Sequence, residues 1–178
     1  MEPRDGGLER SAPPNVRFVG RLSDAELADH YRRWRPLIYP QESDFAIVAV
    51  KGVGGSHLAC DARSAEAVAR LRERKRRPSK PLAVMFPDLA GIEREAHVWP
   101  DEARTLEGAR RPILLLQRRG RTSLAQAVGP GLRELGASLP GTPLHHPLLR
   151  AFGGPLVMTS GNLSEEPIAA GNREALDR

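Results

Sequence analysis

The chain has 178 residues, of which 40% are hydrophobic, and this length suits one domain, or one domain with an appendage. Only 4% of the residues are aromatic, so a core must be built from Leu, Val, Ile and Ala. The single cysteine, Cys60, excludes an internal disulfide and a cysteine-based zinc site, and we expect it to pack in the core. No apolar run approaches the roughly 20 residues that span a bilayer, and the polar N-terminus is unlike a signal peptide, so we expect a cytoplasmic protein with no membrane partner.

The net charge of +5 favours phosphate-bearing partners such as nucleotides or RNA. An arginine-rich surface that only keeps the protein soluble is an equally simple explanation.

The N-terminal part of the chain differs in pattern from the rest. Residues 1–14 are polar and rich in Gly and Pro, which predicts a disordered lead-in. The segment 15–44 reads as strand, helix and strand, because Leu27, Tyr31 and Trp34 have the spacing of one helical face.

From residue 45 onward, strands and helices alternate across short turns, which predicts an α/β or α+β layered domain. The continuous apolar run 45–50 predicts a buried central strand, and Ser64 is expected to cap a helix from Ala65 to about Arg76. The remaining expected elements are strands at 82–86, 112–116 (buried) and 155–158, and helices at 101–108, from Thr142-Pro143 onward, and near Glu174.

Three segments could contact a ligand, and the first is the loop KGVGGSH at 51–57. Its glycines allow a close approach of the backbone and can turn N–H groups toward an anion. The loop matches neither a Walker A motif nor G-x-G-x-x-G, and an ordinary tight turn explains it equally well.

The second segment is RERKRRPSKP at 72–81, which carries six basic residues in nine positions. Cations at a helix C-terminus offset the helix dipole, but this number exceeds that need and favours a triphosphate or an RNA backbone.

The third segment is TSGNLS at 159–164, whose hydroxyls and amide follow a strand and are placed to contact a ligand. A simple Asx or Ser turn is its alternative reading. Adjacent histidines, His145 and His146, would point in different directions on a helix, so we do not expect them to form a metal pair.

Five segments together resemble the nucleotide-binding, YrdC-like domain of the HypF family of hydrogenase-maturation carbamoyltransferases, from about residue 45 to residue 178. They are IVAVKGVGGSHLACDA (47–62), ERKRRPSKPLAVM (73–85), RRPILLL (110–116), GPGLRELG…LPGTPLHHPLLR (129–150) and GGPLVMTSGNLSEEPI (153–168). The threonylcarbamoyl-adenylate synthases share the K-x-R…KP and S-x-N motifs.

The resemblance implies a twisted mixed sheet with flanking helices and a basic pocket, truncated at its C-terminus. It implies that the pocket binds ATP with Mg²⁺, joins a carbamoyl group derived from carbamoyl phosphate to the adenylate, and releases pyrophosphate. In the complete family system, a transfer domain then passes the carbamoyl group to the C-terminal cysteine of an acceptor protein during nickel–iron hydrogenase maturation.

The motif matches imply roles for individual residues. The set implied to bind ATP and its phosphates is Lys75, Arg77, Lys80, Ser160, Asn162 and Ser164. The set implied to form the loop on the carbamoyl side is Lys51, Gly54, Gly55 and His57. No nucleophilic side chain and no protein-bound metal are expected, since Mg²⁺ would arrive with ATP.

The chain also departs from the family pattern. Ser56 stands in place of an aromatic residue, Glu165 in place of a glycine, and Gly141 in place of a tyrosine. Pro147 falls inside an expected helix, where proline costs on the order of 3 kcal/mol. The closing segment of the family domain is absent, so we expect any activity to be impaired.

Residues 15–48 instead resemble part of the nucleotide-sugar-binding half of GT-B glycosyltransferases, although the second acid of that motif is missing. We infer a chimera whose two parts meet within 45–50, with a natural linker domain as the alternative. Two further functions therefore remain open: a non-catalytic module that binds double-stranded RNA or tRNA, and an inactive glycosyltransferase fragment.

Overall fold

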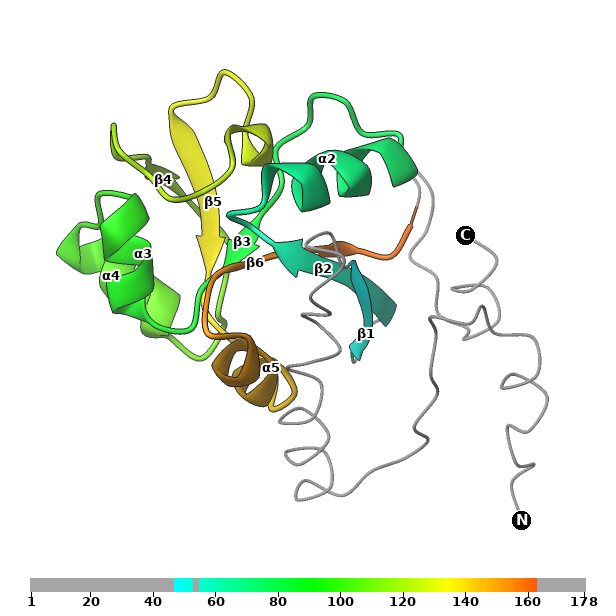
Figure 1. Ribbon diagram of the computed structural model, residues 1–178. Helices are drawn as coiled ribbons and strands as arrows, with labels where there is room; N and C mark the ends of the chain where they lie inside the picture. Colours follow the sequence, from blue (N-terminus) through cyan, green and yellow to red (C-terminus); the bar gives the residue numbers. More distant parts are fainter. Residues whose placement is uncertain (1–46, 53–54, 163–178) are drawn as a thin grey trace, which may run out of the picture.

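The computed structural model describes residues 47–52 and 55–162 (Figure 1), so the expected lead-in, the segment 15–44 and the helix near Glu174 lie outside the described residues. Six strands form one mixed sheet in the order β1-β2-β6-β3-β5-β4, in which only β3 and β5 are parallel neighbours. This arrangement confirms the expected α/β class. The strands are β1 (Val48–Gly52), β2 (Gly55–Asp61), β3 (Val84–Met85), β4 (Leu114–Gln117), β5 (Glu134–Ser138) and β6 (Leu156–Ser160). The helices are α2 (Ala65–Arg74), α3 (Leu89–Glu95), α4 (Pro100–Glu107), the 3₁₀ turn η1 (Gln126–Val128) and α5 (His145–Phe152).

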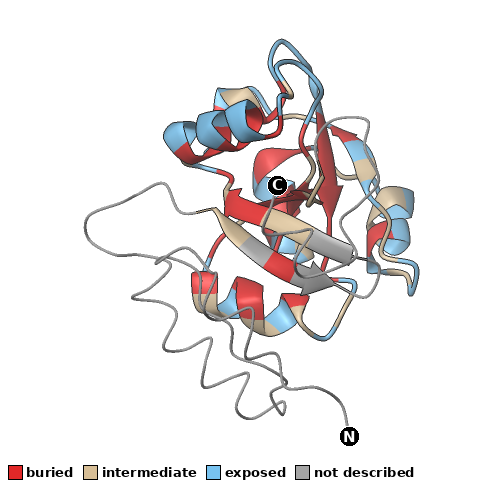
Figure 2. Ribbon diagram, turned by 90° about the vertical axis from the view of Figure 1, so that its right-hand side faces the viewer, coloured by how far each residue is buried: buried red, intermediate tan, exposed pale blue. Residues whose placement is uncertain are grey.

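Helices cover both faces of the sheet and divide its core into two clusters (Figure 2). The larger cluster joins one face to α2, α3, α4 and η1, and the smaller joins the other face to α5. Strand β6 supplies both, because Val157 faces the larger cluster while Leu156 and Met158 face the smaller. The expected strand at 155–158 is therefore confirmed as a central strand. Strand β3 pairs with it at Leu156 and Val157, and β2 pairs with it as far as Ser160.

Helix α2 forms where the sequence predicts it. The Ser64 side chain accepts a hydrogen bond from the Ala67 amide at 3.2 Å, which satisfies one N–H group of the first turn. Val68 and Leu71 are fully buried on its inner face. The helix ends at Arg74, slightly before the expected end, because Arg76 turns to a left-handed backbone with φ of 49°.

The two strands expected to be buried in the sheet are instead its edges. Within the described part of the chain, strand β1 pairs only with β2, and β4 pairs only with β5. At β1, Ile47 packs against the larger cluster and Val50 against the smaller, so the run is apolar because both of its faces are covered. At β4, Ile113 and Leu115 are 59% and 66% exposed, which contradicts the expectation of a buried strand. A continuous apolar run indicates that both faces of a strand are covered. It does not indicate whether the strand has a hydrogen-bonded neighbour on each side.

Three elements were not predicted from the sequence. Strand β2 begins inside the glycine-rich loop, where Gly55 pairs with Gly52 to make a hairpin. Strand β5 contains Gly136 and is stabilised by its position between β3 and β4. Small residues have low strand propensity, so tertiary pairing decided these two strands. Helix α3 has a local signal that was overlooked, the cap Asp88, whose Oδ1 accepts from the Gly91 amide at 2.7 Å.

The single cysteine packs as expected. Cys60 lies on β2 and is 2% exposed. Burial, with a smaller effect from Asp61, raises the pKa of its thiol to about 12. The thiol is therefore protonated at neutral pH and is unsuited to act as a nucleophile.

Helix α5 corrects the expected effect of Pro147. The helix begins at His145 and not at Thr142-Pro143, so Pro147 is the third residue of its first turn. Amides in the first turn have no partner within a helix, so the missing N–H of proline removes no hydrogen bond there. The expected penalty of about 3 kcal/mol does not apply at this position.

The first prediction compares two neighbouring residues of α5. Pro147→Ala should change the free energy of unfolding by less than about 1 kcal/mol, because the only change is a more flexible unfolded chain. Leu148→Ala should cost about 2–5 kcal/mol, because Leu148 is 2% exposed in the smaller core cluster. Urea unfolding monitored by circular dichroism measures both. A stabilisation of about 3 kcal/mol in Pro147→Ala would contradict this account of the helix start.

Candidate functional site

The basic segment and the S-x-N turn meet through Lys75. Lys75 caps the C-terminus of α2 and is 2% exposed. Its Nζ lies 2.5 Å from the Ser160 carbonyl oxygen, 2.6 Å from that of Asn162, and 3.3 Å from Asn162 Oδ1. Two segments 85 residues apart in sequence are thus joined by one ammonium group. This contact brings together the two segments that carry the residues predicted to bind ATP, but the Lys75 ammonium, expected to hold triphosphate oxygens, is bonded to protein oxygens instead.

The ammonium group is matched to its surroundings. An ammonium has three donors and no acceptor, and three oxygen atoms of the turn lie around it. Burial, and then the positive charge of Arg77, lowers the pKa of Lys75 to about 8. Lys75 is therefore still mostly protonated at neutral pH, and it loses its charge as the pH rises past 8.

The turn is also fixed from within. Ser160 Oγ lies 2.5 Å from Asn162 Oδ1, and the same oxygen faces Lys75 Nζ. Two donors on one amide oxygen set the orientation of the Asn162 side chain. The end of β6 therefore places the Ser160 hydroxyl, the Asn162 amide and the buried Lys75 ammonium close together.

Arg72 shapes the loop that carries Arg77 and Lys80. The residue is 8% exposed, and its guanidinium donates to the carbonyl oxygens of four residues. The acceptors are Ala127 at 2.6 Å, Arg77 at 2.8 Å, Lys80 at 3.0 Å and Val128 at 3.3 Å. Arg72 therefore ties the basic loop to η1.

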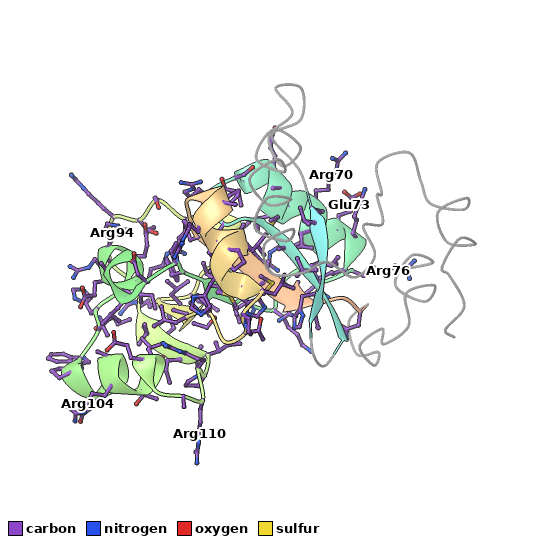
Figure 3. The ribbon with its side chains drawn as sticks, turned by 90° about the horizontal axis from the view of Figure 1, so that it is seen from below. Arg70, Glu73, Arg76, Arg94, Arg104 and Arg110 are labelled. Carbon is purple, nitrogen blue, oxygen red and sulfur yellow. The ribbon has the colours of Figure 1, made fainter. Side chains whose placement is uncertain are left out.

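Arg72 was not singled out within its charged run by sequence reasoning. A signal was present, because Val68, Arg72 and Lys75 follow the i, i+4, i+7 spacing of the buried face of α2. The outer face carries the solvated charges instead. Figure 3 shows Arg70 and Arg76 extending away from the ribbon.

Arg77 and Lys80 lie on the loop that Arg72 holds. Arg77 is partly buried, and its Nη2 donates to the Pro81 carbonyl oxygen at 2.6 Å. Its Nε is buried and has no hydrogen-bond partner within the described part of the chain. Lys80 is exposed, and its backbone carbonyl accepts from Arg72. The two residues, which were expected to contact phosphate, thus lie on a loop that is held by Arg72 and follows Lys75.

The glycine-rich hairpin reaches the same end of the sheet. His57 of β2 pairs with Ser160 of β6 and with Val50 of β1. Lys51 lies in β1 and Gly55 begins β2. The structure therefore brings the backbone of the expected carbamoyl-side loop beside the turn. Gly54 and Ser164, both predicted site residues, lie outside the described residues.

A cavity of about 170 Å³ lies at the opposite end of β6 and not between these groups. Three of its polar side chains already have partners: Arg63 binds Asp61 at 3.0 and 3.1 Å, and Glu95 accepts from Ser123 Oγ at 2.5 Å. We therefore assign no binding role to this cavity. Over residues 47–52 and 55–162, no group of three His, Cys, Asp or Glu side chains could hold a metal, and no helix could cross a membrane.

Comparison with known proteins defines the class of this domain. Residues 44–178 match the family Sua5_yciO_yrdC, described as telomere recombination. The chain belongs to this family of YrdC-like domains.

Its relatives narrow the resemblance to carbamoyltransferases. The chain is 54% identical over 134 residues to carbamoyltransferase HypF of Rhodobacter capsulatus, a match that covers 74% of this chain and 18% of that protein. It is 46% identical over 134 residues to carbamoyltransferase HypF of Synechocystis sp., covering 74% and 17%. The crystal structure of full-length HypF in the phosphate- and nucleotide-bound form superposes with a TM-score of 0.74 at 42% identity, covering 89% of this chain and 20% of that one. The chain thus spans less than a fifth of the length of the curated relatives named here.

The second prediction tests the clamp made by Arg72. Arg72→Ala should lower the free energy of unfolding by roughly 3 kcal/mol or more, because it leaves buried carbonyl oxygens without their charged donor. Arg70→Ala, an exposed position on the same helix, should change it by less than about 0.5 kcal/mol. Chemical denaturation of both variants measures the difference. Equal stability of the two variants would show that the loop does not depend on the Arg72 hydrogen bonds.

Proposed function

We propose that this domain binds ATP with Mg²⁺ and activates a carbamoyl group as its adenylate. The contact of Lys75 with the Ser160–Asn162 turn carries the proposal, because it gathers the basic loop and the S-x-N turn at one end of the sheet. The relatives named HypF, which are carbamoyltransferases, supply the chemical class.

The proposed reaction divides the work between the two segments. Hydrolysis of carbamoyl phosphate by water first gives carbamate and inorganic phosphate. A carbamate oxygen then attacks the α-phosphorus of ATP, and the bond from that phosphorus to the pyrophosphate oxygen breaks. Arg77 and Lys80 stabilise the charge that develops on the departing pyrophosphate, and Mg²⁺ enters with the nucleotide. Ser160, Asn162 and Ser164 contact the nucleotide, while the hairpin carrying Lys51, Gly54, Gly55 and His57 faces the carbamoyl group. Lys75, being buried, acts by holding the turn and by adding positive charge beneath it.

This step has a place in a longer reaction sequence. A carbamoyl-adenylate is a reactive mixed anhydride that another domain must consume. In the proposed system, a transfer domain passes the carbamoyl group to the C-terminal cysteine of an acceptor protein during nickel–iron hydrogenase maturation.

Titration calorimetry of the chain with ATP-Mg and then with carbamoyl phosphate tests the proposal. Asn162→Ala and Arg77→Ala should each weaken ATP-Mg binding by at least about tenfold, which corresponds to 1.4 kcal/mol or more. Arg70→Ala and Glu73→Ala are matched controls on the outer face of α2 and should bind as the wild type does. If the wild type does not bind ATP-Mg, or if the site variants bind like the controls, the site assignment is wrong.

The pKa of Lys75 generates a further prediction. Because the group is charged below about pH 8 and neutral above it, ATP-Mg affinity should fall as the pH rises from 7.5 to 9.5, by up to about tenfold per pH unit above 8. The phosphates of ATP stay ionised over this pH range, so a change in affinity would come from a group of the protein. Lys75→Met should bind more weakly and show a flat profile. A wild-type profile that is equally flat would contradict the role of the Lys75 charge.

RNA binding is a second candidate, favoured by the exposed Arg70, Arg74 and Arg76 at the outer side of α2. These cations would contact the phosphates of double-stranded RNA or tRNA without reading sequence. Binding would then weaken steeply with salt and be indifferent to ATP. Filter binding at several salt concentrations, with Arg70→Ala as the test variant, separates this function from the first.

A further inference from the structure

Two histidines from different elements meet beside the S-x-N turn. The rings of His57 on β2 and His145, the first residue of α5, stand perpendicular with centroids 6.4 Å apart. His145 is 7% exposed, so it is more than nine-tenths buried. Sequence reasoning dismissed it as one of an adjacent, divergent pair. The fold instead pairs it with a distant histidine.

These imidazoles carry buried polar atoms that the described residues do not satisfy. Neither Nδ1 nor Nε2 of His145 has a hydrogen-bond partner there, and the same holds for His57 Nδ1. A buried polar atom left without a partner costs roughly 1–3 kcal/mol, so several such atoms together indicate a polar ligand. Thr142, whose carbonyl oxygen accepts from the His145 amide at 3.1 Å, adds a buried hydroxyl of the same kind.

The pair lies on the same face of the sheet as Ser160. Alternate residues of a strand lie on the same face of the sheet. His57 therefore lies on the same face as Ala59, and Ser160 lies on the same face as Met158. Ala59 and Met158 both pack against α5. Since His57 and Ser160 also pair across the two strands, His57 lies beside the turn that Lys75 holds, and His145 lies next to His57.

Both rings are held in the neutral form. Burial lowers the pKa of His57, and burial followed by the charges of His57 and His146 lowers the pKa of His145. A neutral imidazole offers one acceptor nitrogen and one N–H donor. A carbamoyl group offers the complement, an amino group that donates and a carbonyl oxygen that accepts.

We propose that His145, together with His57, binds the carbamoyl group and selects it over acyl groups that lack the amino group. A ring nitrogen accepts from the carbamoyl NH₂, and a ring N–H donates to its carbonyl oxygen. The inference rests on the proposed function and assigns the specificity of that site to a residue on α5. An acetyl group of nearly the same shape leaves the acceptor nitrogen unpaired, and a site built in this way rejects such an analogue strongly.

The test compares carbamoyl phosphate with acetyl phosphate, which carries CH₃ in place of NH₂. Each is titrated into the chain saturated with Mg²⁺ and a non-hydrolysable ATP analogue. The wild type should prefer carbamoyl phosphate by at least about tenfold. His145→Phe should abolish this preference without changing affinity for the ATP analogue. His145→Gln, which keeps a donor and an acceptor, should restore part of it, and His146→Ala, an exposed neighbour, should behave as the wild type does.

Stability separates recognition from a structural role. Phe replaces buried, unpaired nitrogens with an apolar ring, so His145→Phe should be at least as stable as the wild type toward urea. Retained preference in a folded His145→Phe, or an equal loss of affinity for both acyl phosphates, would overturn the inference. A wild type that binds the ATP analogue but shows no preference would overturn it while leaving the nucleotide site intact. If the wild type binds no ATP analogue, the proposed function fails as well.

Discussion

A single buried ammonium group holds together the two segments on which the site depends. Lys75 leaves α2 at its last turn and reaches the backbone oxygens at the end of β6. A buried cation is tolerated only where acceptors surround it, since an unpaired buried charge is strongly unfavourable. The need to satisfy this charge therefore fixes where α2 ends relative to β6. The basic loop that follows Lys75 is brought to the same place.

The rest of the fold supports this contact from both sides. Strand β6 lies inside the sheet, and its end at Ser160 is held by pairing with His57 of β2. On one face, Arg72 anchors the basic loop to η1 through four carbonyl oxygens. On the other face, α5 brings His145 to His57. The sheet end is thus held by an anchored loop on one face and by α5 on the other, and the proposed binding of ATP would use this preorganised geometry.

Much of this arrangement could be predicted from the sequence. The helix capped by Ser64 and the strand before Ser160 follow from local signals that act within a few residues. The resemblance to HypF supplied the expectation that the basic segment and the turn at Ser160 and Asn162 lie together, which no local pattern contains. The structure brings Lys75 to that turn, although its ammonium contacts protein oxygens where a contact with triphosphate was expected.

The features that could not be predicted from the sequence depend on tertiary contacts. Strand β1 looked central because both of its faces are apolar, and only pairing partners reveal an edge. Pro147 looked harmful because the helix begins two residues later than the sequence indicated. Arg72 and His145 resemble their solvated neighbours in sequence. The fold alone distinguishes them, by burying one against η1 and the other against β2.

The central claim is that the Lys75 ammonium is buried at the turn. The most direct test is to titrate Lys75 with and without ATP-Mg and to monitor the titration by the ¹⁵N chemical shift of Nζ. The buried ammonium at the turn should titrate near its lowered pKa of about 8 in the free protein, well below its ordinary value of 10.5. Bound triphosphate should raise that pKa, because negative charge nearby favours the protonated form. A Lys75 that titrates near 10.5, and does not respond to ATP-Mg, would contradict the account.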